Sequence, residues 1–283
     1  MFENRKIAFI GPGVMAEAMI GGLIREGVAK PEALIAAGPS QERLDQLIHK
    51  FGISATLDNA AAARQADVVV LSVKPQRLDK VLVGLRGSVQ PDTLVLSIVA
   101  GAPLVKIAGG LGHDNVVRSM PNTPAQIGEG ITVWTAAPKV SEEQRQMARQ
   151  ILSALGEEIF MEDENYLDMA TALSGTGPAY VFMFMEAMVD AGVHLGFPRR
   201  IAEQLVARTV RGSVDYYWDR DDPAHLARLR NQVTSPGGTT AQALYYLEKA
   251  GFRTAISRAI WAAYERSREL GAEARSHAPD KAD

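Results

Sequence analysis

Six residues near the N-terminus read Gly-Pro-Gly-Val-Met-Ala, a spacing that can hold a pyrophosphate group. Gly11 permits a tight turn, Gly13 lets a pyrophosphate approach the backbone, and Ala16 is small enough for close packing of a helix on a strand. Val14 and Met15 would open that helix, whose free N–H groups and dipole attract an anion. The pattern predicts a dinucleotide site if a strand precedes it and a helix follows. The alternative is a tight turn that binds no ligand.

The elements around this turn have the order of an α/β domain. Up to about residue 163, short runs rich in β-branched residues alternate with helical patterns. Runs such as VVVLS and LVLSI are almost continuously apolar, as expected for a parallel sheet with helices on both faces. We therefore predict a doubly wound Rossmann-type domain over residues 1–163. Strands are expected at 6–10, 34–37, 68–72, 94–98, 115–119, 131–135 and 157–161, and helices at 15–26, 41–50, 60–64, 75–85 and 142–155.

Beyond residue 163 the strand signal stops. The sequence becomes rich in Ala, Leu, Met, Arg and Glu at helical spacing, and Gly and Pro fall at the breaks. This pattern predicts an all-helical C-terminal domain over residues 164–283. The expected fold class is therefore α/β, a Rossmann-type domain followed by a helical one.

The composition excludes several classes of function. The 283 residues carry 30 Lys and Arg against 33 Asp and Glu, a net charge of −3, which is unlike the basic balance of a nucleic-acid-binding domain. The absence of Cys excludes a disulfide scaffold, a thiolate metal site and a cysteine nucleophile, and we expect no metal. No signal peptide or membrane-spanning stretch is evident, so we expect a cytoplasmic protein without a membrane partner.

The end of the second predicted strand bears on the choice of nicotinamide cofactor. An NAD enzyme usually carries an acidic residue there, about 20 residues past the glycines, to accept from the ribose 2′-OH. This chain instead has Gly38, Ser40 and Arg43, whose N–H, hydroxyl and guanidinium groups can donate to a 2′-phosphate. We therefore predict NADPH, with NADH as the weaker alternative. Ser40 could also simply cap the next helix, and Arg43 could be a solvated helix residue.

Three further loops follow the carboxyl ends of predicted strands. Because these ends meet at one edge of a parallel sheet, the loops should line one crevice and form a floor for the nicotinamide ring. Taken singly, each is an ordinary loop between strand and helix, and Lys74 could be only a loop cation. The residues predicted to bind the cofactor there are Ser72, Val73, Lys74, Pro75, Ala100, Gly101 and Asn122.

A second candidate anion site lies in the helical half, where residues 235–240 read Ser-Pro-Gly-Gly-Thr-Thr. Pro and the two Gly end the preceding helix, so Thr239 and Thr240 should fall at the cap and first turn of a helix over residues 241–249. The N–H groups of Gly238, Thr239 and Thr240 would then point at a small carboxylate. The alternative is that one of the two threonines merely caps the helix.

Five segments of the chain resemble the pyrroline-5-carboxylate reductase family. They occur in the family's order over nearly the whole chain. The Ser-Pro-Gly-Gly-Thr-Thr segment is far more particular than the glycine turn, which many dehydrogenases share. The segments read FIGPGVMAEAMIGGL, LSVKPQ, VVRSMPNTPA, ALSGTGPAYVFMFMEAMVDAG and VTSPGGTTAQALYYLEKAGFR.

The resemblance implies the last step of proline biosynthesis, in which a hydride passes from reduced nicotinamide to the imine carbon of 1-pyrroline-5-carboxylate and gives L-proline. It implies that this small molecule is bound by Ser235, Gly238, Thr239 and Thr240. Thr240 is the expected catalytic residue, because its hydroxyl can hydrogen-bond the ring nitrogen of a bound iminium. The resemblance also implies that Asn59 lies near the adenosine ribose, although Asn59 could instead cap a helix.

The resemblance further implies an intertwined homodimer formed through the helical halves, which in several family members assembles into a decamer. Family members also place a carboxylate near the substrate amine, upstream of residues 235–240. Here the corresponding region, residues 219–229, is longer than the usual pattern, so no carboxylate is assigned.

Two other functions are compatible with parts of the sequence. A two-domain hydroxyacid dehydrogenase would share both halves, but its class places a lysine on the substrate helix after a segment like Ser-Gly-Thr-Gly. Here the helical half has only Lys249 and Lys281, both far from that segment, which counts against this class. A non-catalytic NADPH-sensing module would bind the cofactor without turnover, and it leaves residues 235–240 unexplained.

Overall fold

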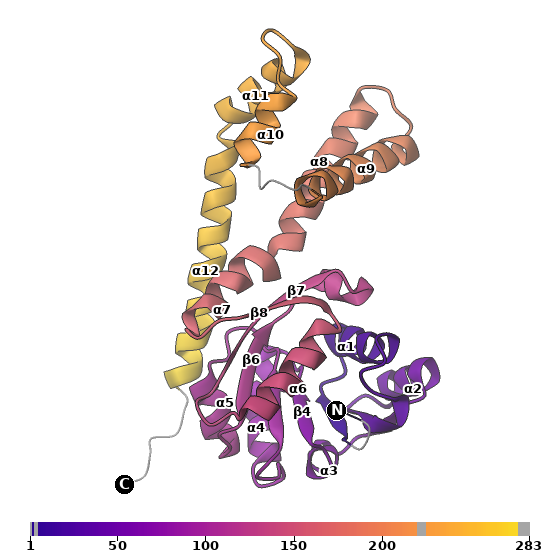
Figure 1. Ribbon diagram of the computed structural model, residues 1–283, viewed down its shortest axis with the longest axis vertical. Coiled ribbons are helices and arrows are strands. Elements are labelled where there is room, and N and C mark those ends of the chain that lie inside the picture. Colours follow the sequence, from indigo (N-terminus) through magenta and orange to yellow (C-terminus); the bar gives the residue numbers. More distant parts are fainter. Residues whose placement is uncertain (1, 3–4, 220–224, 277–283) are drawn as a thin grey trace. The chain divides into compact units, whose positions relative to one another are not determined.

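The computed structural model of the chain consists of two compact units (Figure 1). We call them the sheet unit, Met1–Thr176 with Ala262–Asp283, and the helical unit, Gly177–Trp261. The polypeptide enters the helical unit after Thr176 and returns to the sheet unit at Ala262, so the helical unit is inserted between two stretches of the sheet unit. The residues that the structure describes are 2, 5–219 and 225–276.

The packing units do not coincide with the boundary that the sequence suggests at residue 163. Helix α7 (Asn165–Ala170) and the π-helical turn η4 (Thr171–Gly175) lie in the sheet unit. The long helix α12 (Phe252–Ser276) begins in the helical unit and ends in the sheet unit. The change from strand patterns to helix patterns along the sequence does not show that the polypeptide returns to the sheet unit at Ala262.

One eight-stranded sheet forms the frame of the sheet unit (Figure 1). Its order is β3-β2-β1-β4-β5-β6-β7-β8, so the chain order of the strands reverses beside β1. Open α/β sheets bind ligands at such a switch point, outside the carboxyl ends of the strands. The strands are β1 (Ile7–Ile10), β2 (Leu34–Ala37), β3 (Ser54–Thr56), β4 (Val68–Leu71), β5 (Leu94–Ser97), β6 (Val116–Met120), β7 (Gly130–Ala136) and β8 (Gly156–Phe160).

The central strands are apolar on both sides because helices cover the sheet. Every residue of β1, β2, β4 and β5 is buried, as the continuous apolar runs predict. In register, Ile7 pairs with Leu34 of β2 on one side and with Val68 of β4 on the other. Helix α1 adds Ile20 and Leu23 to the same core. The predicted α/β fold class is confirmed.

The sheet differs from the predicted one at two places. The edge strand β3 is not among the predicted strands, because its three partly exposed residues, Ser-Ala-Thr, carry no apolar run. Strand β7 runs antiparallel to β6, whereas all other neighbours are parallel. Between β6 and β7 lies only the short turn η3 (Thr123–Ile127), and a parallel neighbour would need a longer crossover.

The helices of the sheet unit begin and end at local signals in the sequence. Ser40 caps α2, Gly52 ends it in the left-handed conformation, and Ser141 with Gln144 forms a capping box on α6. The predicted helix at 75–85 is a short turn, η2, followed by α4. The bounds are α1 (Val14–Arg25), α2 (Gln41–Phe51), α3 (Asn59–Arg64), α4 (Leu78–Leu85), α5 (Leu104–Leu111) and α6 (Glu142–Ser153), with the turns η1 (Pro31–Ala33) and η2 (Pro75–Arg77).

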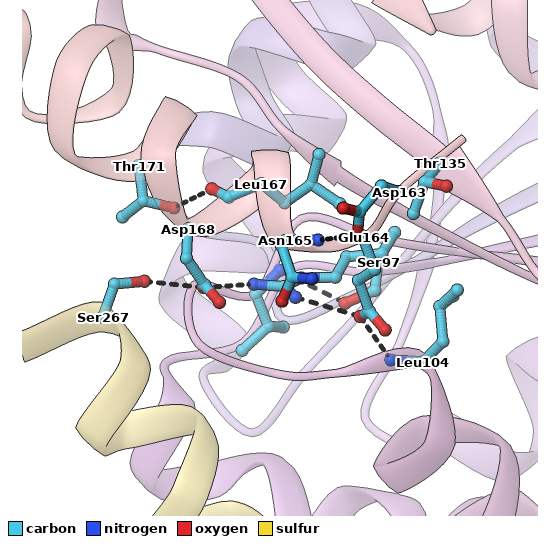
Figure 2. Close-up of polar contacts among 12 residues, drawn as sticks. Ser97, Leu104, Thr135, Asp163, Glu164, Asn165, Leu167, Asp168, Thr171 and Ser267 are labelled. Carbon is cyan, nitrogen blue, oxygen red and sulfur yellow. Dashed lines mark hydrogen bonds and ion pairs between the residues drawn. The ribbon is translucent and has the colours of Figure 1, made fainter. Parts of the chain in front are cut away.

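A buried arginine joins the two stretches of the sheet unit. Arg118 of β6, with 5% of its side chain exposed, donates to Glu164 at 2.9 Å and to Asp168 of α7 at 2.8 Å. The Ser267 hydroxyl of α12 donates to the same Asp168 carboxylate at 2.8 Å, and Glu164 also accepts from the N–H of Leu104 (Figure 2). One guanidinium therefore ties the sheet to α7 and, through Asp168, to the returning end of α12.

The helical unit has a small core of its own. Helices α8 (Gly177–His194) and α9 (Arg199–Trp218) pack together, with Val189, Ala202 and Val206 buried between them. The other helices are α10 (Leu226–Gln232), α11 (Thr239–Lys249) and the first part of α12. The described residues of this unit contain no strand, which agrees with the predicted all-helical half.

Large apolar side chains remain exposed on the helical unit. Phe182 is 63%, Met183 74% and Trp218 72% exposed, far more apolar surface than a monomer usually leaves in water. Over the part of the chain that the structure describes, no helix is both long and apolar enough to span a bilayer. The exposed side chains are therefore suited to a protein interface.

Replacing Arg118 by Met should lower the free energy of unfolding of the sheet unit by about 3 kcal/mol, because it leaves two carboxylates without their cation. Urea denaturation followed by the fluorescence of the buried Trp134 measures this loss, in a background in which Trp218 and Trp261 are replaced by Phe.

Lys139→Met is the matched control for that experiment. Lys139 pairs with Asp114 at the surface, where their side chains are 72% and 60% exposed, so its loss should cost less than about 1 kcal/mol. Equal effects of the two substitutions would contradict the role assigned to Arg118.

Candidate functional site

A cavity of about 840 Å³ opens at the carboxyl ends of the parallel strands of the sheet unit. Its volume lies in the range of small-molecule binding sites. Its walls are the turn after β1, the loops after β2 and β3, and the loop after β4 with one face of α4. Of the residues predicted to bind a cofactor, Gly11, Gly13, Gly38, Asn59, Ser72, Val73 and Lys74 line this cavity.

The glycine turn has the geometry that the sequence predicts. Gly11 has φ +92°, and a Cβ at this position would lie 2.5 Å from the side chain of Val73, so only glycine fits. The Ser72 hydroxyl donates to the Gly11 carbonyl at 2.9 Å and holds the turn in place. Gly13 is the N-cap of α1 and offers no side-chain acceptor, which leaves the first N–H groups of the helix available to an anion.

Asn59 offers the cavity a buried polar atom. Its Oδ1 is buried and has no hydrogen-bond partner among the described residues. A buried acceptor without a partner costs free energy, so this atom fits a site that a polar ligand completes. The N-cap of α3 is Asp58, which accepts from the N–H groups of Ala60 at 2.9 Å and Ala61 at 3.0 Å. The alternative role of Asn59 as a helix cap is therefore wrong.

Ser40 and Arg43, predicted to hold a 2′-phosphate, do not line the cavity. The Ser40 hydroxyl accepts from the Arg43 N–H at 3.3 Å as the cap of α2. The Arg43 guanidinium donates to the carbonyl oxygens of Pro12 at 2.9 Å and Gly13 at 3.4 Å, and it forms an ion pair with Glu17 of α1. Both side chains thus have structural partners around the glycine turn.

The other predicted cofactor residues lie outside the lining of the cavity. Asn122 is 8% exposed, and its Oδ1 accepts from the N–H of Ile131 at 3.0 Å, which ties the loop after β6 to β7. Gly101 lies against Leu270 of α12. Ala16, in the first turn of α1, is buried, as the packing role of the third turn position requires. The remaining predicted cofactor residues outside the lining are Val14, Met15, Pro75 and Ala100. The predicted floor for the nicotinamide ring stays a prediction.

Several lining residues are absent from the predicted set. Leu57 and Asp58 follow β3, so they were missed together with that strand. Pro39 and Ala60 adjoin predicted residues, whereas four others share a signal that the sequence does carry, a spacing of three, four and seven residues along the helical pattern after β4. These are Arg77, the N-cap of α4, and Lys80, Val81 and Gly84 of the helix itself.

The second candidate site is the N-terminus of α11 in the helical unit. This helix begins at Thr239, two residues before the predicted start, and Gly238 is its N-cap, so neither threonine is the cap. The Gly238 N–H donates to the Ser235 carbonyl at 3.1 Å and is not free for a ligand, contrary to the prediction. Helix geometry instead leaves the N–H groups of Thr239, Thr240 and Ala241 without a carbonyl of a preceding turn.

The turn before α11 depends on its glycines. Gly237 has φ +70°, a conformation that other residues rarely adopt. A Cβ on Gly238 would lie 2.4 Å from the Ser235 hydroxyl oxygen, so the serine side chain occupies that space. Ser235 and Gly238 therefore shape the helix start.

The region upstream, residues 219–229, is described only in part. Residues 220–224 lie outside the described residues, so the carboxylate left unassigned by the sequence stays unassigned. His225 is the N-cap of α10, where its Nδ1 accepts from the Ala227 N–H at 3.1 Å. This contact gives the histidine a structural role.

Known proteins are similar to this chain over nearly its whole length. The "pyrroline-5-carboxylate reductase" of a Synechocystis strain is 42% identical over 266 residues, which cover 94% of this chain and 98% of the relative. The chain belongs to the pyrroline-5-carboxylate reductase family. The reductase of Pseudomonas aeruginosa is also 42% identical, over 94% of this chain and 96% of its own length. The resemblance inferred from the sequence is confirmed.

Family models and a solved structure extend the comparison. The model described as pyrroline-5-carboxylate reductase dimerisation matches residues 164–270, and that described as NADP oxidoreductase, coenzyme F420-dependent, matches residues 6–101. The crystal structure of a Plasmodium falciparum pyrroline carboxylate reductase with NADP bound superimposes with a TM-score of 0.87 at 34% identity, over 95% of this chain and 99% of that one. The chain is an oxidoreductase with its family's dimerisation region, and the predicted homodimer or decamer stays a prediction.

Glu17 gives the glycine turn a measurable pH dependence. Hydrogen bonds from Lys50 and then Arg43 lower the pKa of the Glu17 carboxyl below 4.5, its usual value. Because the folded-state pKa is lowered, the stabilisation is present above 4.5 and is lost as the pH falls through the folded-state pKa.

Glu17→Gln should therefore lower the free energy of unfolding by about 1 kcal/mol at pH 7 and by less at pH 3. Urea denaturation at the two pH values measures the difference. Glu26→Gln, which removes an exposed carboxylate of the neighbouring surface, is the control, and an effect of Glu17→Gln that is equal at both pH values would contradict the assignment.

Proposed function

We propose that this chain reduces 1-pyrroline-5-carboxylate to L-proline with NADPH as the hydride donor, as the last step of proline biosynthesis. The observation that carries the proposal is the pairing, in one chain of this family, of a cavity at a glycine turn with a helix N-terminus suited to a small carboxylate. The names of the relatives, and the NADP bound to one of them, support the same reaction.

The sheet unit has the features that a nicotinamide dinucleotide needs. The unpaired N–H groups at the start of α1 suit its pyrophosphate, and Gly11 and Gly13 let it approach the backbone. The buried Oδ1 of Asn59 suits a donor such as a ribose hydroxyl. Bound NADPH would supply the hydride, and the surrounding residues hold and orient it.

The helical unit has the features that the substrate needs. The N–H groups of Thr239, Thr240 and Ala241 and the positive end of the α11 dipole suit the carboxylate. The Thr240 hydroxyl is placed on the first turn of the same helix, where it can hydrogen-bond the ring nitrogen of the iminium. A protonated iminium accepts a hydride more readily than a neutral imine, so this contact would favour the reactive form.

NADPH oxidation tests the proposed reaction. We expect turnover with 1-pyrroline-5-carboxylate, with formation of proline, and none with a 3-oxo acid or without substrate. Turnover with the 3-oxo acid alone would indicate a hydroxyacid dehydrogenase. NADPH binding without any turnover would indicate a cofactor-sensing module, and either result overturns the proposal.

Thr240→Val tests the role of the hydroxyl. It keeps the shape of the side chain but removes one hydrogen bond, so kcat/KM for 1-pyrroline-5-carboxylate should fall by about tenfold or more. NADP⁺ affinity, measured by titration calorimetry, should not change. Thr240→Ser keeps the hydroxyl and should retain most activity, and a fully active Thr240→Val enzyme would contradict the assignment.

A further inference from the structure

The loop after β5, residues 98–103, packs against the end of α12. Gly101 of this loop is buried and has φ +67°. A Cβ at this position would lie 2.9 Å from the Cβ of Leu270 and 3.5 Å from the Ser267 carbonyl oxygen, so only glycine lets the loop approach the helix this closely. Ser267 and Gly271 are buried and Leu270 is partly buried, whereas the two residues between Ser267 and Leu270 are exposed. One face of the end of α12 therefore packs on the sheet unit at this loop.

Hydrogen bonds hold both ends of the same loop. At its start, the Ser97 hydroxyl accepts from the Val99 N–H at 3.2 Å. At its end, Glu164 accepts from the Leu104 N–H at 2.8 Å, and the same carboxylate pairs with Arg118. The two ends of the loop are therefore fixed to β5 and to the ion pairs of Arg118.

The Ser267 hydroxyl fixes α12 beside this loop. Ser267 is 3% exposed, and its hydroxyl donates to the Asp168 carboxylate at 2.8 Å, on the same oxygen that accepts from Arg118 (Figure 2). Arg118 lies opposite Ser97 in the register of β5 and β6. A helix turn that is hydrogen-bonded in this way has little freedom to slide along the loop. Loss of the Ser267 hydroxyl would therefore loosen the contact at Gly101 and leave the ion pairs of Arg118 in place.

The loop after β5 begins next to the cavity wall formed by the loop after β4. The Ile98 N–H donates to the Leu71 carbonyl at 3.0 Å, so the two loops leave the sheet side by side. Ser72, the residue after Leu71, lines the cavity. A doubly wound sheet binds the two halves of a dinucleotide on either side of its switch point, with the adenosine ribose at the end of β2. The loops after β4 and β5 would then lie on the side of the nicotinamide.

We propose that Ser267 and Leu270 of α12 are positioning residues for hydride transfer, because they fix the loop that supports the nicotinamide ring. The inference rests on the proposed function. Hydride transfer needs the donor and acceptor carbons held close together, and a displacement of about 1 Å can lower the rate by about a hundredfold. The residues of α12 touch the loop rather than the ring, so they act through Gly101.

Ser267→Ala in the full chain tests the role of α12. The kcat for 1-pyrroline-5-carboxylate should fall by about tenfold with little change in KM. The isotope effect on kcat with NADPH deuterated at the transferred position should rise, because hydride transfer becomes more rate-limiting. Bound NADPH should show a smaller gain in fluorescence, because a displaced loop leaves the nicotinamide in contact with water. Affinity for 2′,5′-ADP, which lacks the nicotinamide, should stay unchanged in titration calorimetry.

Thr93→Val is the matched control for the loss of a buried hydroxyl. Thr93 is 2% exposed, and its hydroxyl donates to the Ala66 carbonyl at 2.8 Å, at the amino end of β5 and away from the loop. This substitution should lower the free energy of unfolding as Ser267→Ala does, but it should change neither kcat nor the fluorescence of bound NADPH. Equal effects of the two substitutions on kcat would mean that α12 only stabilises the fold, and would overturn the proposal.

A second set of variants tests the contact between the loop and α12 directly. Gly101→Ala places a Cβ against Leu270 and should lower kcat by more than Ser267→Ala does. Adding Leu270→Gly to Gly101→Ala removes that clash and should restore part of kcat. Gly112→Ala is the control, since Gly112 also has φ +67° but the nearest atom to its added Cβ, in the Arg86 side chain, would be 3.7 Å away. It introduces the same backbone strain and should leave kcat unchanged. No recovery in the double variant would overturn the role of the contact.

The fluorescence and affinity measurements do not depend on turnover. If the parent chain does not reduce 1-pyrroline-5-carboxylate but Ser267→Ala still lowers the fluorescence of bound NADPH, the proposed reaction fails and the positioning role stands. If the parent chain turns over and Ser267→Ala keeps the parent kcat, isotope effect and fluorescence, the reaction stands and the positioning role fails.

Discussion

One buried positive charge holds the two stretches of the sheet unit together. A guanidinium with 5% of its side chain exposed needs anionic partners, and Arg118 finds them in Glu164 and Asp168, beyond the last strand. Asp168 in turn accepts from Ser267, so the far end of α12 is bound to the same charge. Removing Arg118 would leave the carboxylates of Glu164 and Asp168 without their cation. Breaking these ion pairs would therefore cost free energy of folding. The helical unit is consequently an insertion held at both of its covalent ends.

Both candidate sites use the same physical device. Helix α1 has Gly13 as its N-cap and α11 has Gly238, and neither cap supplies a side-chain acceptor to the first turn. Elsewhere in the chain Ser40, Asp58 and Ser141 do supply one. A helix that is capped internally has satisfied its N–H groups, whereas one that begins with glycine leaves them for an anion. Because α4, α5 and α9 also lack a side-chain cap, this feature alone does not distinguish α1 and α11; both of these helices also follow a glycine turn.

The sequence predicts best what depends on local pattern. The four apolar residues of β4 identify a buried strand, and the spacing of glycines after β1 identifies the turn. The antiparallel direction of β7 cannot be predicted from the alternation of residue types along the strand, because parallel and antiparallel strands have the same two-residue periodicity. The role of Arg43 depends on Glu17, 26 residues away, and that of Asn59 on which of two adjacent residues caps α3. Such choices are made by tertiary contacts, so residue type and spacing cannot decide them.

The pairing of Glu17 with Arg43 also changes where the positive charge of the cofactor site lies. A neutralised Arg43 contributes little attraction toward a ligand, because the adjacent carboxylate cancels most of its field. Lys74, Arg77 and Lys80, which line the cavity, then supply positive charge there. Glu17 of α1 thus offsets a positive charge beside the glycine turn, whereas Arg77 and Lys80 leave theirs at the cavity. A chain with a net charge of −3 can in this way present a positive cavity to an anionic ligand.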